Sequence, residues 1–161
     1  MSQRIVIECL SFAREAEVLQ GELPVAGFER VQDMLVSNAG SVQYRLEGAM
    51  GPRNRPQLHL QLDGVLSLCC QRCLEGVDYH LQVGNVLEFV GNEEELTQEE
   101  LEDDSKDFLP AQSEVDVVAL IEDEIILGLP SAPRHDSCAL PAAARDDGIV
   151  SPFAVLKGLK R

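Results

Sequence analysis

The sequence predicts an α+β fold, in which an antiparallel sheet or a partly closed β-barrel carries one long and one short helix. Three segments between residues 41 and 90 alternate apolar and polar side chains, as strands with one buried face do. A segment around residue 120 instead repeats its apolar side chains at helical spacing. The chain has 161 residues, enough for a single domain with a modest core.

Two elements are predicted before the first alternating segment. Residues 4–10 predict a strand, because their two isoleucines face the same side. A short amphipathic helix is predicted within residues 27–35, with Phe28, Val31 and Leu35 on the same face.

The central strands are predicted at residues 41–50, 57–70 and 77–90. Glycine and proline in residues 51–56 indicate a turn between the first two of them. Gly64 interrupts the second strand and indicates a bulge or a bend. Because the links are short, we expect an antiparallel meander with one apolar and one solvated face.

The long helix is predicted over residues 117–129. The spacing Ser113-x-x-Asp116 is that of a capping box at its start. We expect its apolar stripe to cover the apolar face of the sheet, with Glu122 and Asp123 exposed on the opposite side.

The chain divides by composition into a domain and a tail. Residues 1–138 are predicted to form the α+β domain, and within it residues 91–107 are strongly acidic and predict a solvated, mobile loop or a frayed helix. Residues 139–161 predict a flexible tail, because they begin rich in alanine, proline, aspartate and glycine. The last eleven, 151–161, are apolar and basic and predict a terminal docking motif.

Charge restricts the partners that this chain can bind. Its net charge is −15, from 28 acidic and 13 basic residues. Such a surface repels a phosphate backbone, which argues against DNA and disfavours direct RNA binding, and it favours a basic protein as partner. Excess acid that only keeps the protein soluble is the alternative. No apolar run is long enough to span a membrane and no signal peptide is recognisable, so we expect a cytoplasmic protein.

Four residues have the types and spacing of a zinc site. Cys70-x-x-Cys73 can present two thiolates to one ion, and His135-x-x-Cys138 offers a second pair. If the segment after the long helix returns to the strand turn, the two pairs form a Cys₃His set around one structural zinc ion.

Two other interpretations of these cysteines stay open. They are free thiols if Cys70 only continues the apolar side of its strand, where a buried cysteine behaves as a small hydrophobe. They are a redox pair if the thiols exchange with a disulfide, although such motifs usually begin a helix in a βαβ setting. Cys9 and Cys69 have no partner pattern and are interpreted as structural.

No catalytic constellation is recognisable. The chain lacks a glycine-rich phosphate loop, a nucleophile elbow and a nucleophile with a base at recognisable spacing. His59 and His80 fall on the solvated side of their strands. We therefore expect a protein that is not an enzyme.

Partner contacts are expected at two places, the acidic run and the terminal motif. The motif either folds back on the domain or docks on a partner, and a flexible linker would couple it to a second contact by effective concentration. The expected contact residues are Glu93, Glu94, Glu95, Glu99, Glu100, Pro152, Phe153, Leu156 and Lys157.

Three stretches of the chain form a recognisable combination: CQRCLEGVDYHLQV from Cys70, EVDVVALIEDEIILGLPSAPRHDSC from Glu114, and SPFAVLKGLKR from Ser151. In this order and at these separations they resemble the bacterial YceD proteins, the large ribosomal RNA subunit accumulation family. The resemblance covers the chain from about Leu62 to its end. The family's terminal motif usually begins Asn-Pro-Phe, where this chain has Ser151-Pro152-Phe153.

The resemblance implies a non-enzymatic function in the synthesis, processing or stability of large-subunit ribosomal RNA, and so in ribosome biogenesis. Combined with the charge, it points to a basic ribosomal protein or assembly factor as partner. The alternative is a small zinc- or thiol-based regulatory sensor module unrelated to ribosomes.

Overall fold

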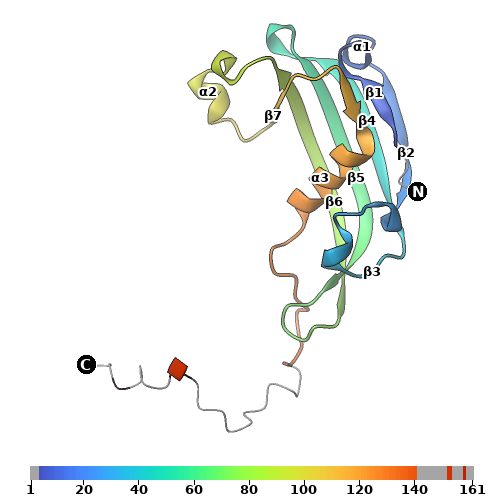
Figure 1. The fold of residues 1–161 in the computed structure, drawn as a ribbon, viewed down its shortest axis with the longest axis vertical. Coiled ribbons are helices and arrows are strands. Elements are labelled where there is room, and N and C mark those ends of the chain that lie inside the picture. Colours follow the sequence, from blue (N-terminus) through green and yellow to red (C-terminus); the bar gives the residue numbers. More distant parts are fainter. Residues whose placement is uncertain (1–3, 141–151, 154–157, 159–161) are drawn as a thin grey trace.

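The computed structural model of the chain describes residues 4–140, 152–153 and 158 (Figure 1). Most of the predicted tail, with the contact residues Leu156 and Lys157, lies outside the described residues. Within them the fold is α+β, as predicted, and the sheet does not close into a barrel.

The larger sheet of the described part has six strands. Five of them follow one another in the order β2-β4-β5-β6-β7, and β3 pairs with β5 off this path. Their bounds are β2 Val18–Pro24, β3 Leu35–Ser37, β4 Ser41–Met50, β5 Pro56–Cys69, β6 Gly76–Val90 and β7 Asp107–Pro110.

The predicted meander is confirmed in β4, β5 and β6. Each pairs antiparallel with the next, and the register of β5 is unbroken from Gln57 to Cys69 against β6. The bulge or bend expected at Gly64 is therefore not a bulge. A side chain there would come within 2.9 Å of the carbonyl oxygen of Ser41 on β4, so close strand contact explains the glycine.

The N-terminal prediction was only partly right. Strand β1 spans Val6–Glu8 and pairs antiparallel with β8, Glu114–Asp116, in a separate two-stranded sheet. Helix α1, Cys9–Arg14, then replaces the rest of the expected strand. The Glu8 carboxylate starts this helix by accepting the backbone N–H groups of Leu10 and Ser11.

The helix predicted within residues 27–35 was wrong. Phe28 and Val31 are buried as expected, but the backbone forms a single 3₁₀ turn, Gln32–Met34, and then strand β3, in which Leu35 pairs with Leu68. Three apolar positions over eight residues fit an irregular buried loop as well as a helix, because so short a window contains only two helical turns.

Helix α3, Val117–Gly128, is the predicted long helix and lies across the sheet (Figure 1). Its N-cap is Asp116, whose carboxylate accepts the N–H groups of Val118 and Ala119 at 3.1 and 3.2 Å. Ser113 lies outside the helix, because the residues between it and Asp116 form β8 instead. The helix contributes its apolar stripe to the core: Val117, Val118, Leu120, Ile121 and Ile125 are all buried.

The acidic residues of α3 do not form the exposed face that was expected. Glu122 and Glu124 are 7% and 6% exposed, and only Asp123 lies at the surface. Arg30 explains why Glu122 can be buried, because the backbone N–H and the Nε of Arg30 donate to the Glu122 carboxylate at 2.5 and 2.9 Å. The Nη1 of Arg30 also donates to Asp123 at 2.6 Å. These bonds fasten the loop before β3 onto α3.

The acidic run has local structure and returns the chain to the sheet. It contains a 3₁₀ turn at Glu93–Glu95 and the short helix α2, Gln98–Leu101, which a Thr97–Glu100 capping box starts. Strand β7 follows and pairs parallel with β6. We call residues 91–107 the acidic arm.

Candidate metal centre and acidic arm

The four residues predicted as zinc ligands lie together at one end of the sheet. Cys70 and Cys73 stand in the turn between β5 and β6, and His135 and Cys138 come from the segment after α3 that runs back to this turn (Figure 1). Their ligand atoms all lie within 4.8 Å of one another. Segments more than 60 residues apart therefore form one cluster, which we call the Cys₃His cluster.

Two distances within the cluster are close to those of a tetrahedral metal site. The Sγ atoms of Cys70 and Cys138 are 3.8 Å apart, and Cys73 Sγ is 3.3 Å from His135 Nδ1. Zinc–ligand bonds of about 2.3 Å to sulfur and about 2.0 Å to nitrogen place two sulfurs about 3.8 Å apart and a sulfur and a nitrogen about 3.5 Å apart. These two distances are therefore compatible with a shared metal ion.

The turn that carries the first pair is closed by its own backbone. The Cys70 N–H donates to the Glu75 carbonyl at 2.8 Å, and the Leu74 N–H donates to the Cys70 carbonyl at 2.9 Å. Leu74 takes the left-handed conformation, with φ of 65°, that lets the chain reverse here. A further bond, from Gln71 N–H to the Pro133 carbonyl at 2.8 Å, holds the second segment against this turn.

The second nitrogen of His135 sets which tautomer faces the sulfurs. His135 Nε2 lies 2.9 Å from the carbonyl oxygen of Gly76, which can only accept a hydrogen bond. Nε2 therefore carries the proton and leaves the lone pair of Nδ1 directed at the cluster. Metal-binding histidines are commonly oriented by this kind of outer hydrogen bond.

The backbone also favours a thiolate at Cys70. Backbone N–H groups of Cys73, His135 and Arg72 hydrogen-bond to its sulfur and lower the pKa of the thiol to about 5, while burial acts in the opposite direction. The thiolate is the form that ligates a metal. Four such side chains would complete a tetrahedron around one ion, as in structural zinc sites.

The two remaining cysteines are not part of the Cys₃His cluster. Cys9 is buried at the start of α1, and burial raises the pKa of its thiol to about 11. Cys69 points its sulfur toward the backbone carbonyls of Cys70 and Leu74 at 3.8 and 3.7 Å.

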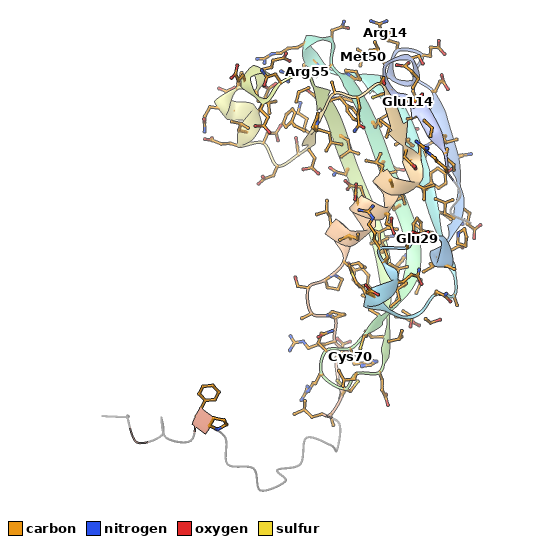
Figure 2. The ribbon with its side chains drawn as sticks, in the orientation of Figure 1. Arg14, Glu29, Met50, Arg55, Cys70 and Glu114 are labelled. Carbon is orange, nitrogen blue, oxygen red and sulfur yellow. The ribbon has the colours of Figure 1, made fainter. Side chains whose placement is uncertain are left out.

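A buried ionic network holds the acidic arm at the other end of the sheet. Figure 2 shows Arg55 and Cys70 at these opposite ends. Glu88 of β6 is fully buried and accepts hydrogen bonds from Arg55 Nη1 at 3.2 Å, Gln57 Nε2 at 2.6 Å and Lys106 Nζ at 3.0 Å. Burial raises the pKa of this carboxyl, but these bonds outweigh burial and keep the pKa below its ordinary value.

This network was not predicted from the sequence. Glu88 lies on the polar side of its strand, which the alternation predicts to be solvated. It is buried because the arm folds over this end of the sheet: Arg55 donates to Glu100 at 2.9 Å and to the Glu95 carbonyl at 2.9 Å. A lone Arg55 after a turn carries no local signal that it will pair with carboxylates 33 and 45 residues away.

The expected contact residues of the arm fall into two groups. Glu100 is turned inward and also accepts a bond from Arg53 at 3.3 Å, so its charge is already balanced. The other four, Glu93, Glu94, Glu95 and Glu99, are exposed. Two expected contact residues of the terminal motif, Pro152 and Phe153, are among those that the structure describes, and both are exposed.

No helix among residues 4–140 is long and apolar enough to cross a membrane. Residues 4–140 contain both the Cys₃His cluster and the acidic arm.

Comparison with known proteins identifies the family. The family model of the large ribosomal RNA subunit accumulation protein YceD matches residues 58–160, which include the Cys₃His cluster, the acidic arm and the terminal motif as far as Lys160. The Haemophilus influenzae large ribosomal RNA subunit accumulation protein YceD is 26% identical over 147 residues, covering 83% of this chain and 82% of the relative. No solved structure matches. The chain therefore belongs to the YceD family.

Proposed function

We propose that this protein is a ribosome biogenesis factor that supports the synthesis, processing or stability of large-subunit ribosomal RNA and has no enzymatic activity. The observation that carries the proposal is the family match over residues 58–160, together with the name of the Haemophilus influenzae relative. The closed ligand set of the Cys₃His cluster agrees with it, because a structural site leaves no position for a substrate. We place the protein in the cytoplasm, where ribosomes assemble.

The partner that we propose is a basic ribosomal protein or assembly factor, bound through the acidic arm. Glu93, Glu94, Glu95 and Glu99 are exposed there, and a net charge of −15 repels bare RNA. Opposite charge on the partner would speed its association and discriminate against acidic proteins. The terminal motif is the second proposed contact.

We further propose that the Cys₃His cluster binds one zinc ion with a structural function. The ion would join the segment after α3 to the β5–β6 turn, and binding would release the protons of the thiols. Support comes from the donor types, the tetrahedral spacing and the tautomer of His135.

A sensor module that responds to metal or redox state is the second candidate. The observation that favours it is the partial exposure of Cys73 and Cys138, which lets an oxidant reach two of the three cluster thiols. A sensor predicts stoichiometric metal or a reversible disulfide, and no effect of gene deletion on ribosomal RNA.

Gene deletion in the source organism tests the main proposal. A biogenesis factor predicts a lowered ratio of large- to small-subunit RNA in the deletion strain and co-sedimentation of the protein with precursor particles. An unchanged RNA ratio would count against the proposal and in favour of the sensor.

Affinity purification tests the partner separately. The arm variant changes Glu93, Glu94, Glu95 and Glu99 to glutamine. A matched control changes four exposed acids elsewhere, Glu29, Asp33, Glu75 and Asp78. We expect the arm variant alone to lose a basic protein that resists nuclease treatment. Recovery of bare ribosomal RNA with equal strength at high salt would refute the protein-partner mechanism.

A further inference from the structure

A groove on the acidic arm is lined by both apolar and acidic side chains. Its volume is about 830 Å³, and it lies between the end of β6, the arm and β7. Leu96, Leu101 and Phe108 contribute apolar surface, and Glu93, Asp103 and Asp104 contribute carboxylates. We call it the acidic groove.

The ionic network around Glu88 also fixes α2, which contributes Glu100 and Leu101 to the groove. Arg53 and Arg55 bind Glu100 of α2, and Arg55 is anchored in turn on the buried Glu88. Lys106 is the cation of the groove, but it already binds Glu88 and its Nζ lies 5.3 Å from the centre of the Phe108 ring. Leu101 is 61% exposed on this fixed scaffold, so a large apolar side chain faces solvent among carboxylates.

An occupant of such a groove should be a short segment with apolar residues and several cations. The C-terminal residues 151–161 of this chain have that composition: they contain three basic residues, no acidic ones, and Phe153, Val155, Leu156 and Leu159. This concentration of positive charge stands out in a chain of net charge −15. We propose that the acidic groove binds residues 151–161 of a second copy of this chain.

The length of the linker favours a second copy over the same molecule. The groove lies at the Val90 end of β6, and the Cys₃His cluster lies at its Gly76 end. A strand of 15 residues separates its ends by up to about 46 Å. The 15 residues from Cys138 to Phe153 reach at most about 50 Å when fully extended, and a flexible linker of this length averages about 21 Å. Docking on the same molecule would therefore hold the linker almost fully extended.

Two copies can exchange their terminal segments reciprocally. Each then contributes one groove and one segment, which forms a closed dimer with two identical contacts. The contact would cover both surfaces that the proposed function assigns to a basic partner, so self-association and partner binding would compete. The self-association itself does not depend on the ribosomal function.

Fluorescence anisotropy with a labelled peptide of residues 151–161 tests the groove. We expect saturable binding that weakens as salt rises, because three cations meet carboxylates. Leu101→Glu should weaken binding by at least about tenfold. The matched control is Leu127→Glu, an equally simple change at an α3 leucine that is 74% exposed and remote from the groove, and it should change affinity by less than about twofold.

Absence of saturable binding to the wild-type chain, or equal loss in both leucine variants, would overturn the groove assignment. Both leucines are exposed, so either variant should fold, which circular dichroism checks. A peptide with Lys157, Lys160 and Arg161 changed to glutamate should not bind.

The molar mass of the full-length protein in solution tests whether the groove binds the terminal segment of a second copy. Light scattering across a concentration series should show a monomer–dimer equilibrium that Leu101→Glu and deletion of residues 151–161 each shift to monomer, while Leu127→Glu does not. A chain that stays monomeric at every concentration although the peptide binds would refute the dimer. An unchanged ribosomal RNA ratio in the deletion strain would refute the proposed function but not this contact.

Discussion

Removal of metal from the Cys₃His cluster should release the segment after α3 without unfolding the domain. The core is built from the sheet and α3, and none of the residues that line it belongs to the segment 130–138. Apart from the cluster itself, two hydrogen bonds hold that segment to the β5–β6 turn: Gln71 N–H to the Pro133 carbonyl and His135 Nε2 to the Gly76 carbonyl. We therefore expect local opening rather than global unfolding.

The size of the effect follows from these contacts. Two hydrogen bonds contribute about 1 kcal/mol each, so the segment of the metal-free protein should be open about one part in thirty. A metal present at about 1,000 times its Kd adds about 4.1 kcal/mol to the closed state. Opening should then become about a thousandfold rarer when metal is bound.

Limited trypsin digestion measures this opening, because Arg134 lies in the segment and is exposed. Cleavage after Arg134 should accelerate by up to about a thousandfold when zinc is removed with EDTA, since cleavage follows the open fraction. Cleavage after Arg45, in the middle of β4, should not change. Zinc added back in excess of the chelator should restore protection.

Two cysteine variants provide the matched comparison. Loss of a hydrogen bond to a metal ligand lowers metal affinity by roughly 10- to 100-fold. Cys138→Ser removes a proposed ligand itself and should lower zinc affinity by more than that. Cys69→Ser, one residue from the cluster, should bind zinc normally. The reasoning is refuted if protein purified without chelator contains far less than one zinc per chain and Arg134 is cleaved equally fast with and without added zinc.

Three further predictions concern stability, each measured by urea unfolding. Arg55→Ala should lower the free energy of unfolding by about 1.5–3 kcal/mol, because it removes one of the two cations that bind the buried Glu88 carboxylate and leaves Lys106 as the other. Arg53→Ala, half exposed, should lower it by less than about 1 kcal/mol, and equal effects would contradict the network. Gly48→Ala should lower it by about 2–4 kcal/mol because the new Cβ overlaps backbone atoms of α1, while Gly84→Ala, with open space around it, should have little effect. Burial raises the pKa of Glu124, so ionisation of this group lowers the free energy of unfolding once pH rises above its pKa in the unfolded chain. Glu124→Gln should therefore raise the free energy of unfolding at pH 7 and give no such gain at pH 3. The reverse pH trend would exclude this explanation.

The sequence was sufficient for elements whose pattern is long and local. Strands β4, β5 and β6 each span ten or more residues, and α3 spans twelve. Over such lengths a period of 2 or 3.6 distinguishes the buried side from the exposed side, because each residue's environment is set by its own element.

The conformation of the short elements depends on the strands and helices with which they pair and pack. Strand β2 contains Gly21, Glu22 and Pro24, which disfavour a strand, yet it pairs along its whole length with β4. The segment after Phe28 became a 3₁₀ turn and a strand because Leu35 meets Leu68 and Arg30 binds α3. Local preference in segments this short is weaker than the pairing and packing they gain.

The burial of two acidic side chains could not be predicted from the pattern of their own elements either. Alternation places Glu88 on the solvated side of β6, and helical periodicity does the same for Glu122. Both are buried, because the acidic arm covers the first and the Arg30 loop covers the second. The pattern of one element cannot show what another element places over it.

The sequence alone determined the fold class, the central meander and the long helix, and it indicated two candidate ligand pairs, because each depends on residues close together along the chain. Only the tertiary structure decided that the ligand pairs meet across 62 and 68 residues, and that Glu88 becomes a buried anchor for the acidic arm. Such meetings depend on where the sheet and α3 direct distant segments, and no local period encodes that direction.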